Sequence, residues 1–170
     1  MKKTFSFLIM GFCFFALFGQ TSAENIVNES GRLAAVEGFI YGNVQQVGFR
    51  AFIFRQAIRY NLGGLISNQP DGSVHFFLQG EKDLMDKALV VIRKGPDKAS
   101  VTRVQLDNRL IENGLTSVTV QGWTSASRDF TKPVDLVYPL RADNSEIQES
   151  EVSRIYKSII RSAMDSIEGD

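Results

Sequence analysis

The chain has 170 residues, a formal net charge of zero at neutral pH and 44% hydrophobic residues. Because binding to nucleic acid or to an anionic membrane surface needs an excess of lysine and arginine, this balance argues against both. The length suits one domain with a substantial core.

The N-terminal stretch "MKKTFSFLIMGFCFFALFGQTSA" has the order of a secretory signal peptide. Lys2 and Lys3 precede an apolar run over residues 5–18, and small or polar residues follow as far as Ala23. We therefore predict that residues 1–23 form a signal peptide in a bacterial periplasmic or secreted protein. The alternative is an uncleaved N-terminal anchor, but the run is shorter than the roughly 20 residues that span a membrane.

Cleavage after Ala23 would remove Cys13, the only cysteine, as well as two of the 19 basic residues. The mature chain would then carry a net charge of −2, have no disulfide and depend on packing for its stability. We expect no stable membrane insertion after cleavage and no nucleic-acid partner.

Residues 24–32 are polar and without periodicity, and we predict a flexible leader there. Residues 33–42 read as a strand. Residues 49–60 read as a helix, since their apolar side chains recur at spacings of three and four. Asn61 is expected to end this helix in the left-handed conformation.

The pattern over residues 64–121 continues with alternating strands and one further helix. Residues 81–94 give the clearest helix, with acidic residues in the first turn and basic residues in the last. The predicted strands are residues 64–67, 73–79, 101–107 and 115–121. This order predicts an α+β fold, a ferredoxin-like α/β sandwich with an antiparallel-rich, five-stranded sheet and two helices on one face.

Residues 123–170 form a C-terminal extension of different character. Residues 134–140 suggest a short extended piece, and residues 144–170 suggest a helix. One stripe of that helix is apolar: Val152, Ile155, Ile159, Ala163 and Ile167. Because such a stripe must be buried, we expect the helix to dock on the open sheet face around His75 and Phe77, or on a second copy. A protein partner bound through this helix is the alternative. His75 itself is expected to be solvated.

Common catalytic motifs are missing from the sequence. It has no G-x-x-x-x-G-K-[ST], H-E-x-x-H, C-x-x-C or G-x-S-x-G segment. A single histidine, His75, excludes a site built from several histidines. We expect neither a metal nor a cofactor.

The segment "YGNVQQVGFR", residues 41–50, lies between a predicted strand and a predicted helix. Backbone N–H groups in such a loop converge at the helix N-terminus and bind anions, above all phosphate. The loop residues are Asn43, Val44, Gln45, Gln46, Val47 and Gly48. Arg50 in the first helical turn opposes the helix dipole unless an anion is bound there. The alternative is a surface arginine after a structural glycine turn.

Three segments, "GNVQQVGFR", "GGLISNQPDG" and "IRKGPDKASVTRV", occur in this order. They resemble the motifs of the acylphosphatase family, which read roughly G-x-V-Q-G-V-x-F-R, G-W-V-x-N-x-x-D-G and G-P-x-x-A-x-V. The resemblance covers about residues 33–122 and implies an acylphosphatase-like domain over that range. The fold of this family is the ferredoxin-like sandwich, in agreement with the periodicity.

The resemblance implies that Arg50 binds phosphate and that Asn68 positions a water molecule. The reaction would be hydrolysis of a small acyl phosphate to a carboxylate and inorganic phosphate, without a metal. From the residues alone, Asn68 also fits a turn-initiating role before "QPDG". Three features depart from the family pattern. Gln46 stands where the motif has glycine, and the chain also carries a predicted export signal and a C-terminal extension. The alternative function is therefore a non-enzymatic periplasmic binding or interaction module on the same fold.

Overall fold

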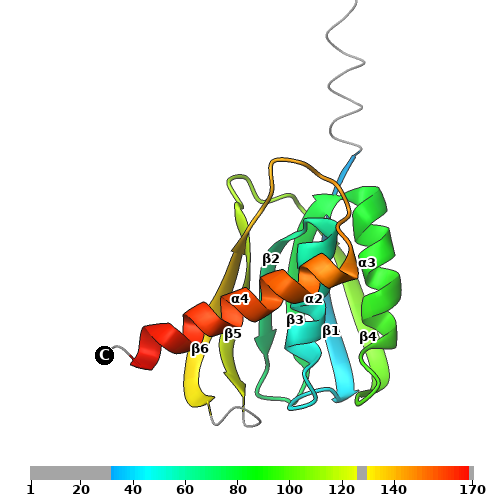
Figure 1. Ribbon diagram of the computed structural model, residues 1–170. Coiled ribbons are helices and arrows are strands. Elements are labelled where there is room, and N and C mark those ends of the chain that lie inside the picture. The colour runs from blue at the N-terminus through cyan, green and yellow to red at the C-terminus, as the bar shows by residue number, and fades with distance from the viewer. Residues whose placement is uncertain (1–31, 126–129, 169–170) are drawn as a thin grey trace, which may run out of the picture.

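The computed structural model describes residues 32–125 and 130–168 (Figure 1). The predicted signal peptide and residues 24–31 of the predicted leader lie outside this part of the chain. The elements in order are β1 (Leu33–Asn43), α2 (Phe49–Tyr60), β2 (Gly63–Asn68), β3 (Val74–Glu81), α3 (Lys82–Lys94), β4 (Ser100–Arg109), β5 (Ser117–Ser125), β6 (Phe130–Pro139) and α4 (Glu149–Glu168).

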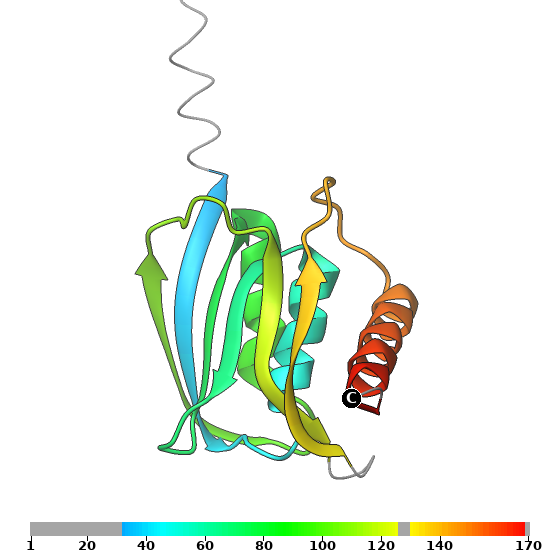
Figure 2. The same cartoon turned by 90° about the vertical axis from the view of Figure 1, so that its left-hand side faces the viewer.

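The strands form one sheet in the order β4-β1-β3-β2-β5-β6, in which only β2 and β5 pair in parallel. Figure 2 shows the helices on one side of this sheet. The predicted ferredoxin-like α+β sandwich is confirmed, but the predicted strand count of five is wrong. The sixth strand is β6, which pairs antiparallel with β5 from Ser117↔Pro139 onward and hydrogen-bonds an edge that β5 would otherwise expose.

The core fills the space between the sheet and the helices. Alternate residues of the central strands face it, and the other residues of each strand face away. The largest side chains with less than 2% exposure are Phe49, Phe54, Phe76, Ile40, Ile53, Ile58, Leu62, Ile66, Leu78, Met85, Ile92 and Leu136. Leu136 belongs to β6, so the extension is part of the same core.

Helix α4 packs against α2 and β6, on the helical side of the sheet (Figure 1). Val152 and Ile160 are buried in the main core, and the Tyr156 ring meets the Phe54 ring edge-on at 6.4 Å between centroids. The prediction that this helix covers the face around His75 and Phe77 is wrong. Because β6 extends the core-facing side of the sheet, the apolar stripe of α4 packs against β6 and α2 on that side.

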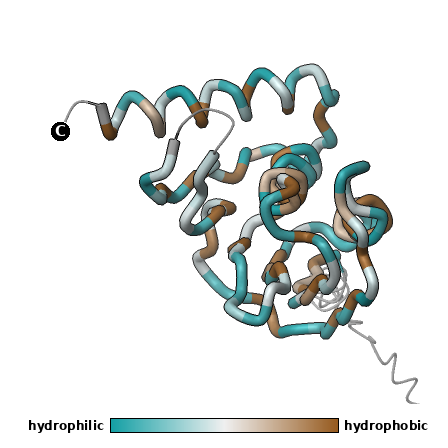
Figure 3. Tube along the Cα trace, turned by 90° about the horizontal axis from the view of Figure 1, so that it is seen from below, coloured by the Kyte–Doolittle hydropathy of each residue, from teal (hydrophilic) through white to brown (hydrophobic). Residues whose placement is uncertain are grey.

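Apolar and polar positions alternate along α4 (Figure 3). Its exposed side carries Arg154, Lys157 and Arg161, interspersed with acidic residues. None of the described helices is long and apolar enough to cross a membrane.

Polar contacts also fix the segment that leads into α4. Arg59 of α2 forms an ion pair with Glu146 at 2.6 Å, and Arg55 forms one with Glu149. Lys87 of α3 reaches the other oxygen of Glu146 at 3.3 Å. The segment that leads into α4 is therefore held to both α2 and α3.

Candidate active site

The loop from β1 to α2 begins and ends at glycines whose backbone requires them. Gly42 has φ 127°, and a Cβ there would lie 2.0 Å from the Ser100 carbonyl oxygen. Gly48 has φ 83° and precedes the first residue of α2. L-residues with a side chain rarely adopt these conformations, so the two glycines define the path of residues 43–48.

The N-terminus of α2 is open to an anion. Gly48 provides no side-chain cap, and the first turn contains no acidic residue. The first intrahelical bond runs from Phe52 N to Gly48 O at 2.9 Å, so the preceding N–H groups have no partner within the helix. These donors and the positive end of the helix dipole make this turn suitable for a phosphate group.

Arg50 is half-buried and tied to the backbone of β5. Its Nη1 donates to Gln121 O at 2.6 Å and to Gly122 O at 2.9 Å. Its Nε and Nη2 make no hydrogen bond to the residues that the structure describes. Burial lowers the pKa of the Arg50 guanidinium below its ordinary value, although the group stays charged at neutral pH. Arg50 is therefore not a freely solvated surface arginine.

Asn68 is the last residue of β2, and its Oδ1 atom is buried. No group within residues 32–125 and 130–168 donates a hydrogen bond to that oxygen. Leaving a buried carbonyl oxygen unpaired costs roughly 1–3 kcal/mol, which a bound water molecule would recover. The Asn68 amide is thus a suitable acceptor for a water proton.

The parallel pairing of β2 and β5 brings Asn68 and the Arg50 anchor to the same end of the sheet. The pairing ends at Ile66↔Val120, and the two strands run in the same direction, so Asn68 and residues 121–122 both follow the paired part at one end of the sheet. Figure 1 shows that the β1–α2 loop lies at this end as well. The predicted loop, Arg50 and Asn68 therefore come together, although no hydrogen bond joins Arg50 to Asn68 in the described structure.

The Gln45 side chain has a role that the sequence pattern does not indicate. Its Nε2 donates to Gln69 O at 2.8 Å and to Ser73 O at 2.9 Å, in the turn that follows Asn68. Asp71 closes that turn by accepting from the Ser73 hydroxyl and backbone N–H, and these bonds lower the pKa of Asp71. Gln45 therefore fixes the loop relative to the end of β2.

Gln46, which stands where the family motif has glycine, adopts φ 60° in the left-handed region. Its side chain is exposed and makes no hydrogen bond to other described residues. The loop therefore keeps its left-handed turn with a residue that is strained there.

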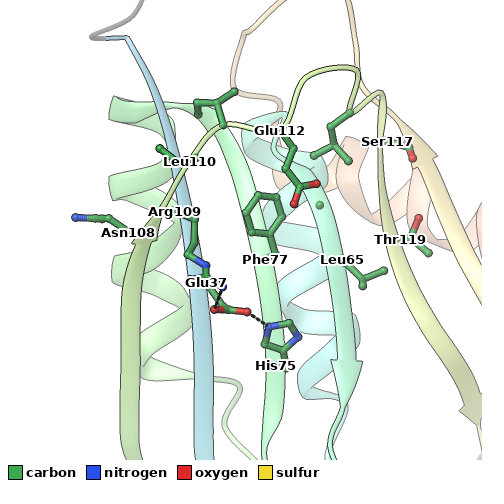
Figure 4. A pocket seen from close by; sticks show the side chains of 13 residues that line it. Glu37, Leu65, His75, Phe77, Asn108, Arg109, Leu110, Glu112, Ser117 and Thr119 are labelled. Atoms are coloured by element: carbon green, nitrogen blue, oxygen red, sulfur yellow. Dashed lines mark hydrogen bonds and ion pairs between the residues drawn. The ribbon is translucent and has the colours of Figure 1, made fainter.

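A cavity of about 720 Å³ lies elsewhere, on the sheet face opposite the helices (Figure 4). His75 lines it and contacts Glu37 at 2.9 Å, and Arg109 pairs with the same carboxylate at 3.0 Å. The His75 side chain is only 16% exposed, so the prediction that it is solvated is wrong. No group of three or more His, Cys, Asp or Glu side chains suited to a metal occurs there or elsewhere in residues 32–125 and 130–168.

Two solved acylphosphatases match about half of this chain. The Bacillus subtilis acylphosphatase matches with a TM-score of 0.47 at 24% identity, over 48% of this chain and 91% of that chain. The Coxiella burnetii acylphosphatase matches with a TM-score of 0.47 at 25% identity, over 49% and 88%.

Sequence comparison gives a closer relationship. The family model described as Acylphosphatase matches residues 36–117, which include the loop, Arg50 and Asn68. The Archaeoglobus fulgidus acylphosphatase is 40% identical over 81 residues, which is 48% of this chain and 91% of the relative. The Mycolicibacterium smegmatis acylphosphatase is 38% identical over 74 residues, 44% of this chain and 76% of the relative. With this degree of identity over nearly the whole of a relative, the chain belongs to the acylphosphatase family of hydrolases.

Proposed function

We propose that this protein hydrolyses the carboxyl–phosphate bond of small acyl phosphates, with Arg50 binding phosphate and Asn68 positioning water. The observation that carries the proposal is the meeting of three features at one end of the sheet. They are a helix N-terminus without a side-chain cap, an arginine with two donor groups that no described residue bonds, and a buried amide oxygen that no described residue bonds.

The phosphoryl group would bind between the loop and Arg50. Backbone N–H groups of residues 43–48 and of the first turn of α2 would donate to its oxygens. Because Nη1 of Arg50 is held by two carbonyls, the Nε and Nη2 groups form the side of the guanidinium left for the ligand. Two parallel hydrogen bonds from this side match a phosphoryl group and stabilise the charge that develops on it.

The attacking water would be held by Asn68. Its Oδ1 accepts a hydrogen bond from the water, which directs the oxygen lone pair of the water at phosphorus, in line with the bond that breaks. A P–O bond to water forms as the P–O bond to the acyl oxygen breaks, and its electron pair stays on the carboxylate. The attacking oxygen keeps one proton and the other passes to a phosphoryl oxygen, so the products are a carboxylate and dihydrogen phosphate.

The leaving group explains how so few side chains suffice. A carboxylic acid has a pKa of about 4, so the carboxylate departs at neutral pH without a general acid. The steps above need positioning and charge stabilisation, which the loop, Arg50 and Asn68 provide. They require neither a metal ion nor a covalent intermediate.

The cellular location of the enzyme is proposed from its N-terminal sequence. We propose that the enzyme acts in the periplasm or outside the cell, on the basis of the signal-like residues 1–23. Expression in a bacterial host, followed by fractionation and N-terminal sequencing, checks this. Recovery of uncleaved chain from the cytoplasm would contradict it.

Hydrolysis of benzoyl phosphate by the purified chain, followed by ultraviolet absorbance, tests the activity. Arg50→Ala should lower kcat/KM by about 10³-fold, since one lost transition-state donor costs on the order of 10²–10³ and Arg50 provides two. It should also abolish competitive inhibition by inorganic phosphate. Arg50→Lys is the matched control, because it keeps the charge and loses the paired donors.

The binding-module alternative predicts a different result. Parent protein that binds inorganic phosphate but hydrolyses no acyl phosphate would favour it. An Arg50→Ala variant with parental hydrolysis would show that the reaction occurs at another site.

A further inference from the structure

The backbone of β5 is irregular where it holds Arg50. Val120 pairs with Leu136, whereas Trp123 pairs with Val134. Two residues of β5, Gln121 and Gly122, therefore face one residue of β6, which is Asp135. This is a β-bulge, and its second residue, Gly122, has φ 57°.

The bulge explains how one nitrogen of Arg50 contacts two successive carbonyls. In a regular strand, neighbouring carbonyl groups point to opposite edges, toward the two adjacent strands. Here Gln121 O and Gly122 O both lie within 2.9 Å of Nη1 of Arg50. The local bend turns both oxygens toward α2, so the orientation of Arg50 depends on the bulge.

The side chain of Asp135 holds the bulge in this shape. Its Oδ1 accepts a hydrogen bond from Gly122 N at 2.9 Å. This side-chain bond takes up an amide that the bulge removes from the regular ladder of β5 and β6. Asp135 lies in the extension, outside the matched residues 36–117.

We infer that Asp135 is a positioning residue for Arg50, acting through the Gly122 amide. It fixes the two carbonyls that bind Nη1, and so directs the Nε and Nη2 side of the guanidinium toward the phosphate. The C-terminal extension thereby contributes to the anion site of the domain that precedes it. This inference rests on the proposed role of Arg50 in binding phosphate.

The hydrogen-bond acceptor, rather than the negative charge, does the positioning in this arrangement. No ion pair joins Asp135 to Arg50 in the described structure, and burial alone lowers the Arg50 pKa. Asp135→Asn keeps an acceptor oxygen of the same reach, so it should preserve the bulge. Asp135→Ala leaves the Gly122 amide without its partner.

The test measures binding of inorganic phosphate by titration calorimetry, together with KM and kcat for benzoyl phosphate. Asp135→Ala should weaken phosphate binding and raise KM by about tenfold, with a much smaller change in kcat, because binding of ground state and transition state suffers alike. Asp135→Asn should stay within about twofold of the parent. Asp107→Ala is the matched control. It removes an exposed carboxylate on β4 whose one hydrogen-bond partner among the described residues is Gln105 of the same strand.

Parental phosphate affinity in a folded Asp135→Ala variant would overturn the inference, and so would an Asp135→Asn variant as impaired as Asp135→Ala. Should Asp135→Ala fail to fold, Asp135→Ser, which is too short to reach the amide, gives the same comparison. Phosphate titration is independent of turnover. A parent that binds phosphate without hydrolysis would overturn the proposed function and leave the role of Asp135 measurable.

Discussion

Gln46 and Asn61 share a left-handed backbone conformation, with φ angles of 60° and 53°, just before and just after helix α2. They are the two non-glycine residues with positive φ in the described structure. Gln46 is exposed, and no other described residue bonds its side chain. Asn61 is 6% exposed, and its side chain holds the segment before α4. Replacement by glycine should therefore change the stability of the protein in opposite directions at the two positions.

Replacing Gln46 by glycine should stabilise the protein. Removing a side chain from the left-handed region relieves about 1 kcal/mol, which corresponds to a melting temperature about 2–4 °C higher for a domain of this size. We also expect higher hydrolytic activity, because the loop then holds its left-handed turn without that strain. Calorimetry and the benzoyl phosphate assay check both. A lower melting temperature would show that Gln46 makes a stabilising contact.

Replacing Asn61 by glycine should destabilise the protein despite the easier backbone. The variant loses bonds from Nδ2 to Arg141 O at 3.2 Å and Asp143 O at 3.0 Å, and the bond from Arg141 N to Oδ1 at 2.8 Å. An unpaired buried group costs roughly 1–3 kcal/mol, which exceeds the relief of strain. A melting temperature at or above that of the parent would contradict this account.

Changing Asn68 should separate catalysis from binding. Asn68→Ala is expected to lower kcat by about 10²-fold, the size of effect that lost positioning has on a bound reactant. The inhibition constant of inorganic phosphate should stay near the parental value, since Asn68 is proposed to hold water. Equal loss of both would identify Asn68 as a phosphate ligand or a turn residue. Asn68→Asp, which places a negative charge beside the anion, should instead weaken phosphate binding.

Removing an apolar contact of α4 should lower the stability of the whole domain. Ile160 is 1% exposed in the core, so Ile160→Ala should cost about 2–5 kcal/mol. The neighbouring, exposed Arg161 provides the control, and Arg161→Ala should change stability by less than about 0.5 kcal/mol. One cooperative melting transition at lower temperature is expected for Ile160→Ala. Loss of α4 alone, seen as a separate early transition, would mean that the extension unfolds independently.

Acid should weaken the attachment of the extension. Hydrogen bonds from Arg59 lower the pKa of Glu146, and Lys87 lowers it further. A lowered pKa in the folded state gives stability that is present above the ordinary value of about 4.3 and is lost as pH falls through the folded value. Melting temperatures measured from pH 7 to pH 3 should fall less for Glu146→Gln than for the parent. An equal fall in melting temperature for the parent and Glu146→Gln would exclude a contribution of Glu146 to the loss of stability in acid.

The sequence predicts the central fold well because its signals there are local. Apolar spacing places one helix over residues 49–60, which are the bounds of α2, and strand alternation places β3 within one or two residues. Positive φ at Asn61 follows from the preference for asparagine at the end of a helix. Arg50 and Asn68 are found from motifs whose elements meet at one end of the sheet.

The extension is predicted poorly because its contacts are long-range. An apolar stripe shows that α4 must be buried, yet it does not indicate the surface that receives it. Pro133 and Pro139 obscure the strand signal of β6. The anchors of Arg50 are backbone carbonyls, which every residue has. The one local signal is Gly122, since an isolated glycine within a strand pattern suggests a bulge.

Strand β6 has a protective consequence for the sheet. Without it, β5 would be an edge strand with free backbone donors and acceptors beside Val118 and Val120, and such an edge invites aggregation through pairing with another chain. The edge that β6 presents instead contains Pro133 and Pro139, which lack an N–H group and hinder further strand addition. The extension thus keeps the protein from adding strands at the edge nearest its candidate active site.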